Sequence, residues 1–523
     1  MKIFVRKYFY YIALAVTFLV AFILRCYKLG ELPDMLNIDE ASLGINAWCL
    51  ANYGVDRYLN EMPFYAQNFE GGQSPLYTYC LTLLVKTVGR GNVSLFLLRV
   101  PGLISSMVVV IFGTKLMNLI FQNRKITLMS ALLLTICPYF IVHGRIAMDC
   151  NLMMGCCAVA FYLLGKYIKT QRLADLIVCG VSFGVTLYSY ALSYFILPLF
   201  LVTTGLYLLY TRKITFRRCI LWAVIVCLTG LPVIIFVCSL FFDMGTVRFL
   251  CFNISTMATE RLEDIGNSEF WVKVGRIIRI TLTNYIYTFE AEEKFYTMYF
   301  TSIPFIMIGF ARSCKDVVLS LKKRCFSYSA VFVIFYIFCL ITTGFTNANA
   351  IFQANFYFIS YLYFLVYGIY RVYVWVGTYR KIFISVAAFC YLLWGVAFCR
   401  YYYTLYSVGS VYEGLYGTLW VAPFTGILEK AENLEAERIY IDCFEKEEFY
   451  LFFNLESPYE LKDKRHPEGI GRFYLNINSD TPIDDQSAYI VHKKDEEFVS
   501  KLLNSEITYE VEEFSHYYLF YVE

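Results

Sequence analysis

The sequence predicts a mainly α-helical, polytopic membrane protein. Of its 523 residues, 59% are hydrophobic, 19% are aromatic and only 17% are charged, which is too apolar for a soluble globular protein. The apolar residues gather in runs of roughly 17 to 25, the length that a helix needs to cross the hydrocarbon core of a bilayer. No water is available there, so the backbone must form its hydrogen bonds within helices. The net charge is only +3, and the sequence has no basic domain of the kind that binds nucleic acid.

About eleven hydrophobic segments are long enough to cross the membrane. They lie near residues 8–25, 95–121, 126–142, 151–168, 174–190, 192–210, 219–241, 296–311, 328–344, 350–370 and 381–398. The first segment is preceded by three basic residues, and no small-residue cleavage site follows it. We therefore expect it to be an uncleaved helix rather than a signal peptide.

Basic residues predict the orientation of these helices. Lys and Arg gather at the N-terminus and in alternate connections, which are 124–125, 166–172, 212–218, 312–324 and 371–381. Because cytoplasmic loops carry the excess of basic residues, we place these connections and the N-terminus in the cytoplasm. The protein is then a multi-pass protein of the plasma membrane, with outer loops at 26–94, 143–150 and 242–295.

The large first outer loop is expected to hold two helices that do not cross the membrane. Segment 76–88 is moderately apolar, but it is short and contains Lys86, and counting it as a span would place three basic connections outside. We therefore expect an interfacial or re-entrant helix there. Segment 40–53 has apolar residues at three- and four-residue spacing and is followed by Gly54, which predicts an amphipathic helix.

The composition changes after residue 400. From about residue 429, charged residues alternate with short β-type runs, which lie at 438–442, 449–453, 472–476 and 488–492. A helix near 496–503 and a strand at 517–522 complete the pattern of a small α/β domain. We divide the chain into a membrane domain of residues 1–428 and an α/β domain of residues 429–523. An odd number of spans places the α/β domain outside the cell.

An acidic pair, Asp39 and Glu40, follows the first hydrophobic segment at the start of the amphipathic helix. Acidic residues there stabilise the helix dipole by roughly 0.3 to 1 kcal/mol, which is a sufficient structural explanation. Asp149 favours a functional interpretation, because it is a second carboxylate on the same predicted face. A charge beside a span costs roughly 2.5 to 3.5 kcal/mol on insertion scales and therefore tends to have a function. The alternative is that Asp149 simply pairs with Arg145, four residues before it.

Other polar residues of the outer loops have structural alternatives too. Lys273, Arg276 and Arg279 lie in the long loop 242–295, where they can bind a substrate phosphate or, equally well, anionic lipid headgroups. Residues 71–75 contain two glycines and a proline, which is the composition of an ordinary tight turn.

Several short motifs occur together between residues 35 and 155. They are Asn37-Ile-Asp-Glu, Asn46-Ala, Tyr53-Gly-Val-Asp-Arg, Pro63, Gly72-Gln-Ser-Pro-Leu-Tyr-x-Tyr and Leu98-Arg-Val-Pro. The combination resembles the bacterial relatives of dolichyl-phosphate-mannose protein mannosyltransferases. The lipid A aminoarabinose transferases belong to the same wider class of polyprenyl-phosphate-sugar-dependent enzymes. The resemblance implies a GT-C type fold, with the catalytic site in residues 1–428.

The resemblance also implies roles for individual residues. Asp39 matches the catalytic acidic residue of the family and Glu40 its neighbour, while Arg145-x-x-x-Asp149 matches the functional element of the second outer loop. Asn347 and Asn349 resemble the polar turn of the family, although Ala350 replaces the arginine often found after it. With these two asparagines, Gln73 and Tyr77 of the glycine-rich motif are the expected substrate-binding residues.

The chemistry of sugar transfer fits these assignments. A sugar on polyprenyl phosphate already has a good leaving group, so catalysis needs a carboxylate to accept the proton of the acceptor hydroxyl and a cation to hold the phosphate. We predict an inverting glycosyltransferase in which Asp39 is the general base and Asp149 orients the acceptor or shares that role. The predicted phosphate ligands are Arg145, Lys273, Arg276 and Arg279.

The expected partners are a polyprenyl-phosphate sugar, an acceptor glycan, lipid or protein on the outer face, and membrane lipids. We expect no cofactor and no metal, because the three acidic residues make a poor ligand set and the 18 cysteines include no C-x-x-C pair. One alternative is a transporter or flippase for lipid-linked glycans. It would place polar residues inside several spans, whereas here the charges gather on one predicted face. A non-catalytic scaffold of the cell envelope is the third interpretation.

Overall fold

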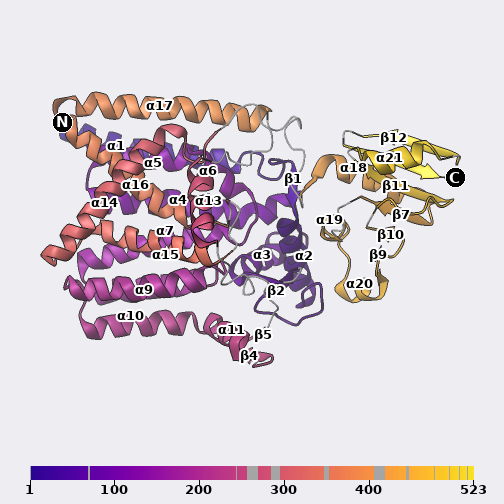
Figure 1. Cartoon of the computed structure of the whole chain (residues 1–523), viewed down its shortest axis with the longest axis horizontal. Helices are drawn as coiled ribbons and strands as arrows, with labels where there is room; N and C mark the ends of the chain where they lie inside the picture. The colour runs from indigo at the N-terminus through magenta and orange to yellow at the C-terminus, as the bar shows by residue number, and fades with distance from the viewer. Residues whose placement is uncertain are drawn as a thin grey trace.

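The computed structural model shows a bundle of helices with a small α/β domain at one end (Figure 1). The described residues are 2–68, 71–242, 244–255, 269–283, 295–346, 351, 353–405, 418–442, 447–475, 477–493, 495–505, 507–514 and 516–522. The bundle contains α1 (Lys2–Cys26), α4 (Leu95–Phe121), α5 (Arg124–Ile136), α6 (Pro138–Val142), α7 (Asn151–Thr170), α8 (Leu173–Thr186), α9 (Ser193–Tyr210), α10 (Phe216–Thr229), α11 (Leu231–Phe242), α13 (Phe270–Thr283), α14 (Ile303–Lys323), α15 (Tyr328–Phe345), α16 (Tyr357–Trp375) and α17 (Arg380–Arg400).

Helices occupy all eleven predicted membrane segments. In the described part of the chain, seven single helices are long and apolar enough to cross a membrane, and the bent pairs α5–α6 and α10–α11 bring the number to nine. Of the two remaining segments, 174–190 overlaps α8, a shorter apolar helix of 14 residues, and 296–311 overlaps α14 only from residue 303, with the charged second half of α14 beyond it. The mainly helical polytopic fold is therefore confirmed.

The first loop contains the two short helices that the sequence predicts, α2 (Ile38–Tyr53) and α3 (Pro75–Thr87). Asn37 and Glu40 form a capping box at the start of α2, and Gly54 ends the helix in the left-handed conformation, with φ of 73°. With only 13 residues, α3 is too short to span a bilayer. Both helices lie between the bundle and the C-terminal domain (Figure 1).

Three two-stranded antiparallel sheets lie near these helices. Their strands are β1 (Met35–Asn37), which pairs with β6 (Thr418–Trp420), β2 (Ala66–Asn68), which pairs with β3 (Gly71–Gln73), and β4 (Val247–Phe249), which pairs with β5 (Phe252–Ile254). The β4–β5 hairpin touches the first loop, because the main-chain amide of Phe64 donates to the carbonyl of Asn253 at 2.8 Å. The two longest predicted outer loops are thus in contact.

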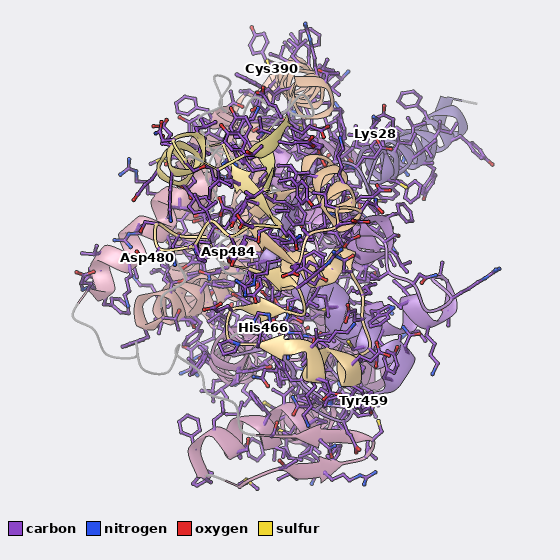
Figure 2. The ribbon with its side chains drawn as sticks, turned by 90° about the vertical axis from the view of Figure 1, so that its right-hand side faces the viewer. Lys28, Cys390, Tyr459, His466, Asp480 and Asp484 are labelled. Carbon is purple, nitrogen blue, oxygen red and sulfur yellow. The ribbon has the colours of Figure 1, made fainter. Side chains whose placement is uncertain are left out.

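The C-terminal domain is built on a mixed seven-stranded sheet in the order β12-β13-β11-β7-β10-β9-β8. Its strands are β7 (Arg438–Ile441), β8 (Arg465–His466), β9 (Gly469–Ile470), β10 (Phe473–Tyr474), β11 (Ser487–His492), β12 (Tyr509–Glu513) and β13 (Tyr517–Val522), and its helices are α18 (Val421–Glu432), α19 (Glu447–Phe453), α20 (Pro458–Lys464) and α21 (Glu496–Leu503). Figure 2 looks onto this domain, with His466 near the middle of the visible face and Asp480 and Asp484 to one side.

One predicted strand of this domain is wrong. Residues 449–453 lie in helix α19, which packs against α2. Glu447 and Glu448 occupy its first turn, where acidic side chains stabilise a helix. The predicted strands near 438–442 and 488–492, the helix 496–503 and the strand 517–522 are confirmed. In the described part of the run 472–476, the strand β10 consists of Phe473 and Tyr474.

Small residues allow helices α14 and α16 to pack with their backbones in contact. A Cβ atom on Gly309 would lie 1.8 Å from the carbonyl oxygen of Phe364, and one on Gly368 would lie 1.9 Å from that of Phe305. Membrane helices rely on such close packing, since the hydrophobic effect does not drive them together in lipid. Gly275 on α13 differs, because among the described residues nothing outside its own stretch of helix lies within 4 Å of the place a Cβ atom would take.

We expect Gly309→Ala to destabilise the bundle by about 1 to 3 kcal/mol, because the two backbones must move apart. Gly275→Ala is the matched control and should leave stability unchanged or raise it by up to about 1 kcal/mol. The melting temperatures of both purified variants in detergent provide the measurement. Equal melting temperatures would show that the α14–α16 contact does not limit stability.

Candidate active site

Three segments that are distant in the sequence meet at the end of the bundle that faces the C-terminal domain. They are the start of α2, the turn between β3 and α3, and the connection 143–150 between α6 and α7. Gln73 donates through Nε2 to the carbonyl oxygen of Asp39 at 3.2 Å, and the adjacent Ser74 donates to Asp149. Glu40 accepts from the main-chain amide of Ala147 at 2.7 Å. The predicted proximity of the 37–40 segment to Asp149 is therefore present in the structure.

Asp39 is half-buried at the second position of α2, and its carboxylate is oriented by a neighbour that the sequence did not indicate. Asn68 at the end of β2 donates through Nδ2 to Oδ1 of Asp39 at 3.1 Å. The Oδ1 atom of Asn68 in turn accepts from the Ser42 hydroxyl at 2.6 Å. This arrangement fixes the amide of Asn68 so that its donor faces the carboxylate. A half-exposed, oriented carboxylate is suited to accept a proton.

Glu40 has a different environment, although it is the next residue. Its side chain is only 1% exposed and forms an ion pair with Arg99 at 3.1 Å. Its two oxygens also accept from the main-chain amides of Ala147 and Asn37. Arg99 uses its remaining donors on the carbonyls of Leu29, Pro33 and Met35. Glu40 therefore holds the segments of the site together, and this geometry favours a structural role for it.

Asp149 is held in place by the turn before α3. Its Oδ2 atom accepts from both the amide and the hydroxyl of Ser74, at 3.1 and 2.6 Å, and its Oδ1 atom accepts from the amide of Cys150 at 2.6 Å. Asn151, two residues after Asp149, donates through Nδ2 to the carbonyls of His143 and Ile146, both at 2.7 Å. The connection before α7 is thus a rigid turn with Asp149 half-buried on it.

Arg145 is fully buried and binds backbone rather than open space. Four of its five N–H groups donate to the main-chain carbonyls of Leu24, Arg25, Lys28 and Leu32, at 2.8 to 3.2 Å. These carbonyls belong to the last turn of α1 and the residues after it, which lack partners within the helix. The geometry supports a helix-capping role for Arg145 and gives no support to its predicted contact with a phosphate.

The two predicted substrate-binding residues of the glycine-rich motif are buried. Besides Asp39, Gln73 contacts Asn46, whose Nδ2 donates to Oε1 of Gln73 at 3.2 Å. Tyr77 is fully buried and donates to the carbonyl of Leu98 at 2.9 Å. Burial, and then the negative charge of Glu40, raise the pKa of the Tyr77 hydroxyl well above its ordinary value, so Tyr77 is neutral. Both side chains support the walls of the site.

The other predicted residues lie farther along the chain. On α13, Lys273 is buried, whereas Arg276 and Arg279 are exposed. Asn347 and Asn349 lie outside the described residues. Where the chain is described, no three His, Cys, Asp or Glu residues gather closely enough to hold a metal ion, and the expectation that transfer needs no metal stays a prediction.

Sequence reasoning missed two residues that orient the carboxylates of the site, Asn68 and Ser74. Ser74 lies inside the Gly-Gly-Gln-Ser-Pro turn, so its position just before α3 was a signal that could have pointed to it. No pattern in the sequence distinguishes Asn68, because its contact with Asp39 depends on the β2–β3 hairpin.

Comparisons with known proteins agree with this architecture. A family model described as dolichyl-phosphate-mannose-protein mannosyltransferase matches residues 72–237, and no curated protein matches significantly. The fold is similar to that of ArnT from Cupriavidus metallidurans, a lipid A aminoarabinose transferase. The apo structure of ArnT has a TM-score of 0.53 and 12% identity, and the alignment covers 99% of this chain and 98% of ArnT. The structure of ArnT bound to undecaprenyl phosphate has a TM-score of 0.52 and 12% identity, with 97% of each chain covered.

The fold is also similar to that of the apo oligosaccharyltransferase from Archaeoglobus fulgidus, with a TM-score of 0.50, 13% identity and 86% of this chain covered. This chain spans only 64% of that protein's length. At such identities the structural likeness establishes the fold alone. The resemblance given by the motifs and the GT-C type of the fold are thereby confirmed.

We expect Glu40→Gln to destabilise the protein by about 3 to 5 kcal/mol, because it leaves the buried guanidinium of Arg99 without a charge partner. The neighbouring Asp39→Asn should cost about 1 kcal/mol or less, the value of one helix-dipole interaction, because an amide oxygen can still accept the hydrogen bond from Asn68. Thermal unfolding of the two purified variants compares them directly. A melting temperature for Glu40→Gln close to that of Asp39→Asn would contradict the structural role of Glu40.

Proposed function

We propose that this protein is an inverting glycosyltransferase that moves a sugar from a polyprenyl-phosphate donor to an acceptor on the extracytoplasmic face of the membrane. The observation that carries the proposal is the meeting of Asp39, Asp149 and the Gln73–Ser74 turn at one end of a GT-C type bundle. The match to the mannosyltransferase family model and the fold shared with ArnT support the donor class. The sugar itself is left open, and no cofactor is part of the proposal.

Asp39 is the proposed general base. Its carboxylate accepts from Asn68 through Oδ1 and is half-exposed, so an acceptor hydroxyl can approach it. Proton transfer to a positioned carboxylate contributes about 100- to 10,000-fold to a reaction rate. The acceptor oxygen then attacks the anomeric carbon in line with the departing phosphate, which inverts the anomeric centre.

Asp149 is proposed to orient the acceptor beside Asp39. Both of its oxygens already accept hydrogen bonds from the backbone or from Ser74, which fixes the carboxylate without neutralising it. For the donor phosphate we retain Lys273 and the exposed Arg276 and Arg279 on α13 as proposed ligands, because a cation must stabilise the charge that grows on the leaving group. Arg145 is not retained, since backbone carbonyls occupy four of its donors.

We expect Asp39→Asn to lower the transfer rate by about 100- to 10,000-fold, because an amide cannot accept the proton. The measurement is formation of glycoside by the purified protein with defined polyprenyl-phosphate sugars. Glu31→Gln is the matched control, because Glu31 lies in the same loop and forms an exposed pair with Lys28. Undiminished transfer by well-folded Asp39→Asn protein would remove Asp39 from the mechanism.

The reaction class has its own test. With detergent-solubilised protein, we expect a new glycoside whose anomeric configuration, read by NMR, is opposite to that of the donor. A flippase or a scaffold forms no glycoside under these conditions, because no vesicle or gradient is present. Retained configuration would exclude single in-line displacement, and an absence of product with every polyprenyl-phosphate sugar would refute the proposed activity.

A further inference from the structure

The C-terminal domain is packed directly on α2, the helix that begins at the acidic pair. Strand β6 pairs with β1, so that Thr418 is opposite Asn37, the cap of α2. Helix α19 lies along α2, and Gly44 is so close to Phe452 that a Cβ atom on it would be 2.5 Å from the Phe452 ring. Apolar residues of α2, α3 and the domain form one continuous core cluster.

A fully buried ion pair lies beside this apolar cluster. Arg57, four residues after the end of α2, lies 2.7 Å from Glu448 of α19, and their side chains are 0% and 4% exposed. In the described part of the chain, none of the three guanidinium nitrogens of Arg57 has a hydrogen-bond partner, so its contact with Glu448 is an ion pair without a hydrogen bond. Glu448 is therefore the charge partner that allows Arg57 to be buried, and burying such a charge alone is unfavourable.

A chain of polar contacts leads from this pair to Asp39. The main-chain amide of Arg57 donates to Oδ1 of Asn46 at 3.4 Å. The side-chain Nδ2 of Asn46 donates to Oε1 of Gln73 at 3.2 Å. Gln73 then donates to the carbonyl oxygen of Asp39 at 3.2 Å. Asn46 lies in the middle of α2 and is fully buried. The path from the C-terminal domain to the acidic pair is thus short and continuous.

A second ion pair contacts the loop that contains Arg57 and Tyr58. Arg465 lies 2.6 Å from Glu447. The guanidinium of Arg465 lies 5.0 Å from the centre of the Tyr58 ring, and the guanidinium of Arg57 lies 4.9 Å from the same ring. Tyr459 at the edge of the domain (Figure 2) meets Tyr53, the last residue of α2, with ring centroids 6.2 Å apart. The C-terminal domain therefore contacts the middle and the end of α2, while β6, the strand that leads into the domain, pairs with the strand just before its start.

We propose that the C-terminal α/β domain is a positioning element of the active site, in which Glu448 acts through Arg57, Asn46 and Gln73 to fix Asp39. This inference rests on the proposed function. Apolar contacts alone are non-directional and allow α2 to shift along the domain. Directional hydrogen bonds and a buried ion pair fix one arrangement, and a displacement of about 1 Å in a catalytic group costs about 100-fold in rate.

The first test is Glu448→Gln in the full-length protein, with kcat and KM measured separately. We expect kcat to fall about 10- to 100-fold while KM for the donor changes less than about 2-fold, because the substrate-binding groups stay in place. The charge exchange Arg57→Glu with Glu448→Arg should restore part of kcat. Glu513→Gln, which breaks the exposed Lys493–Glu513 pair of the same domain, is the matched control and should leave kcat unchanged.

The second test does not depend on activity. Hydrogen exchange of the amides of residues 38–46 should be faster in Glu448→Gln than in the wild type, and unchanged in Glu513→Gln. If the wild type transfers no sugar but exchange still responds to Glu448→Gln, the proposed function fails and the coupling stands. If the wild type is active, and both kcat and exchange are unaltered in a folded Glu448→Gln protein, the coupling is wrong and the proposed function stands.

A further variant covers the case in which Glu448→Gln does not fold. Arg57→Met combined with Glu448→Leu removes both charges at similar volume, which commonly preserves stability. We expect this protein to melt near the wild-type temperature with a reduced kcat, because the apolar contacts remain but the ion pair that fixes residue 57, whose main-chain amide bonds Asn46, is lost. A wild-type kcat in the double variant would overturn the inference.

Discussion

The ion pair between Glu40 and Arg99 links the start of α2, the residues after α1 and the connection before α7. The carboxylate of Glu40 pairs with the guanidinium of Arg99 and accepts from the main-chain amides of Asn37 and Ala147. Arg99 also donates to three main-chain carbonyls between α1 and α2. Both side chains are at most 1% exposed, so neither charge can turn to water if the other is lost. The start of α2, the residues after α1 and the connection before α7 are therefore fixed to one another by a single buried contact.

The same principle recurs nearby, where helices end or bend inside the protein. Arg25 donates to the carbonyls of Leu134, Thr135 and Phe140 at the 61° bend between α5 and α6, and Arg145 caps the end of α1. Helix ends leave carbonyls unpaired, and these must be satisfied where water is scarce. A guanidinium suits this task because it offers five donors in one plane. The irregular backbone around the candidate site is thus stabilised by arginines whose donors bind backbone carbonyls.

The sequence predicted the elements whose signals are local. The apolar spacing and the terminal glycine of α2 predicted that helix, which begins two residues earlier than expected, and the apolar runs of the bundle follow from the thickness of a bilayer. What failed depended on contacts between distant segments. The aromatic run 449–453 has the composition of a strand, but it forms a helix whose apolar face is covered by α2. The hydrogen bonds of Arg145 to backbone carbonyls likewise leave no trace in a sequence, and they give no support to its predicted role as a phosphate ligand. Asn68 reaches Asp39 only through a hairpin that no motif marks.

The opposite environments of Asp39 and Glu40 follow from their places in one helical turn. Successive side chains of an α-helix point about 100° apart, so two adjacent carboxylates cannot face the same neighbours. Glu40, at the third position, folds back onto the cap and into the core, where Arg99 makes its burial possible. Asp39, at the second position, is left half-exposed beside Asn68. The rigid burial of one carboxylate thus sets the direction of the other. An acidic pair at this point of the chain therefore combines a structural anchor with a group that is available for proton transfer.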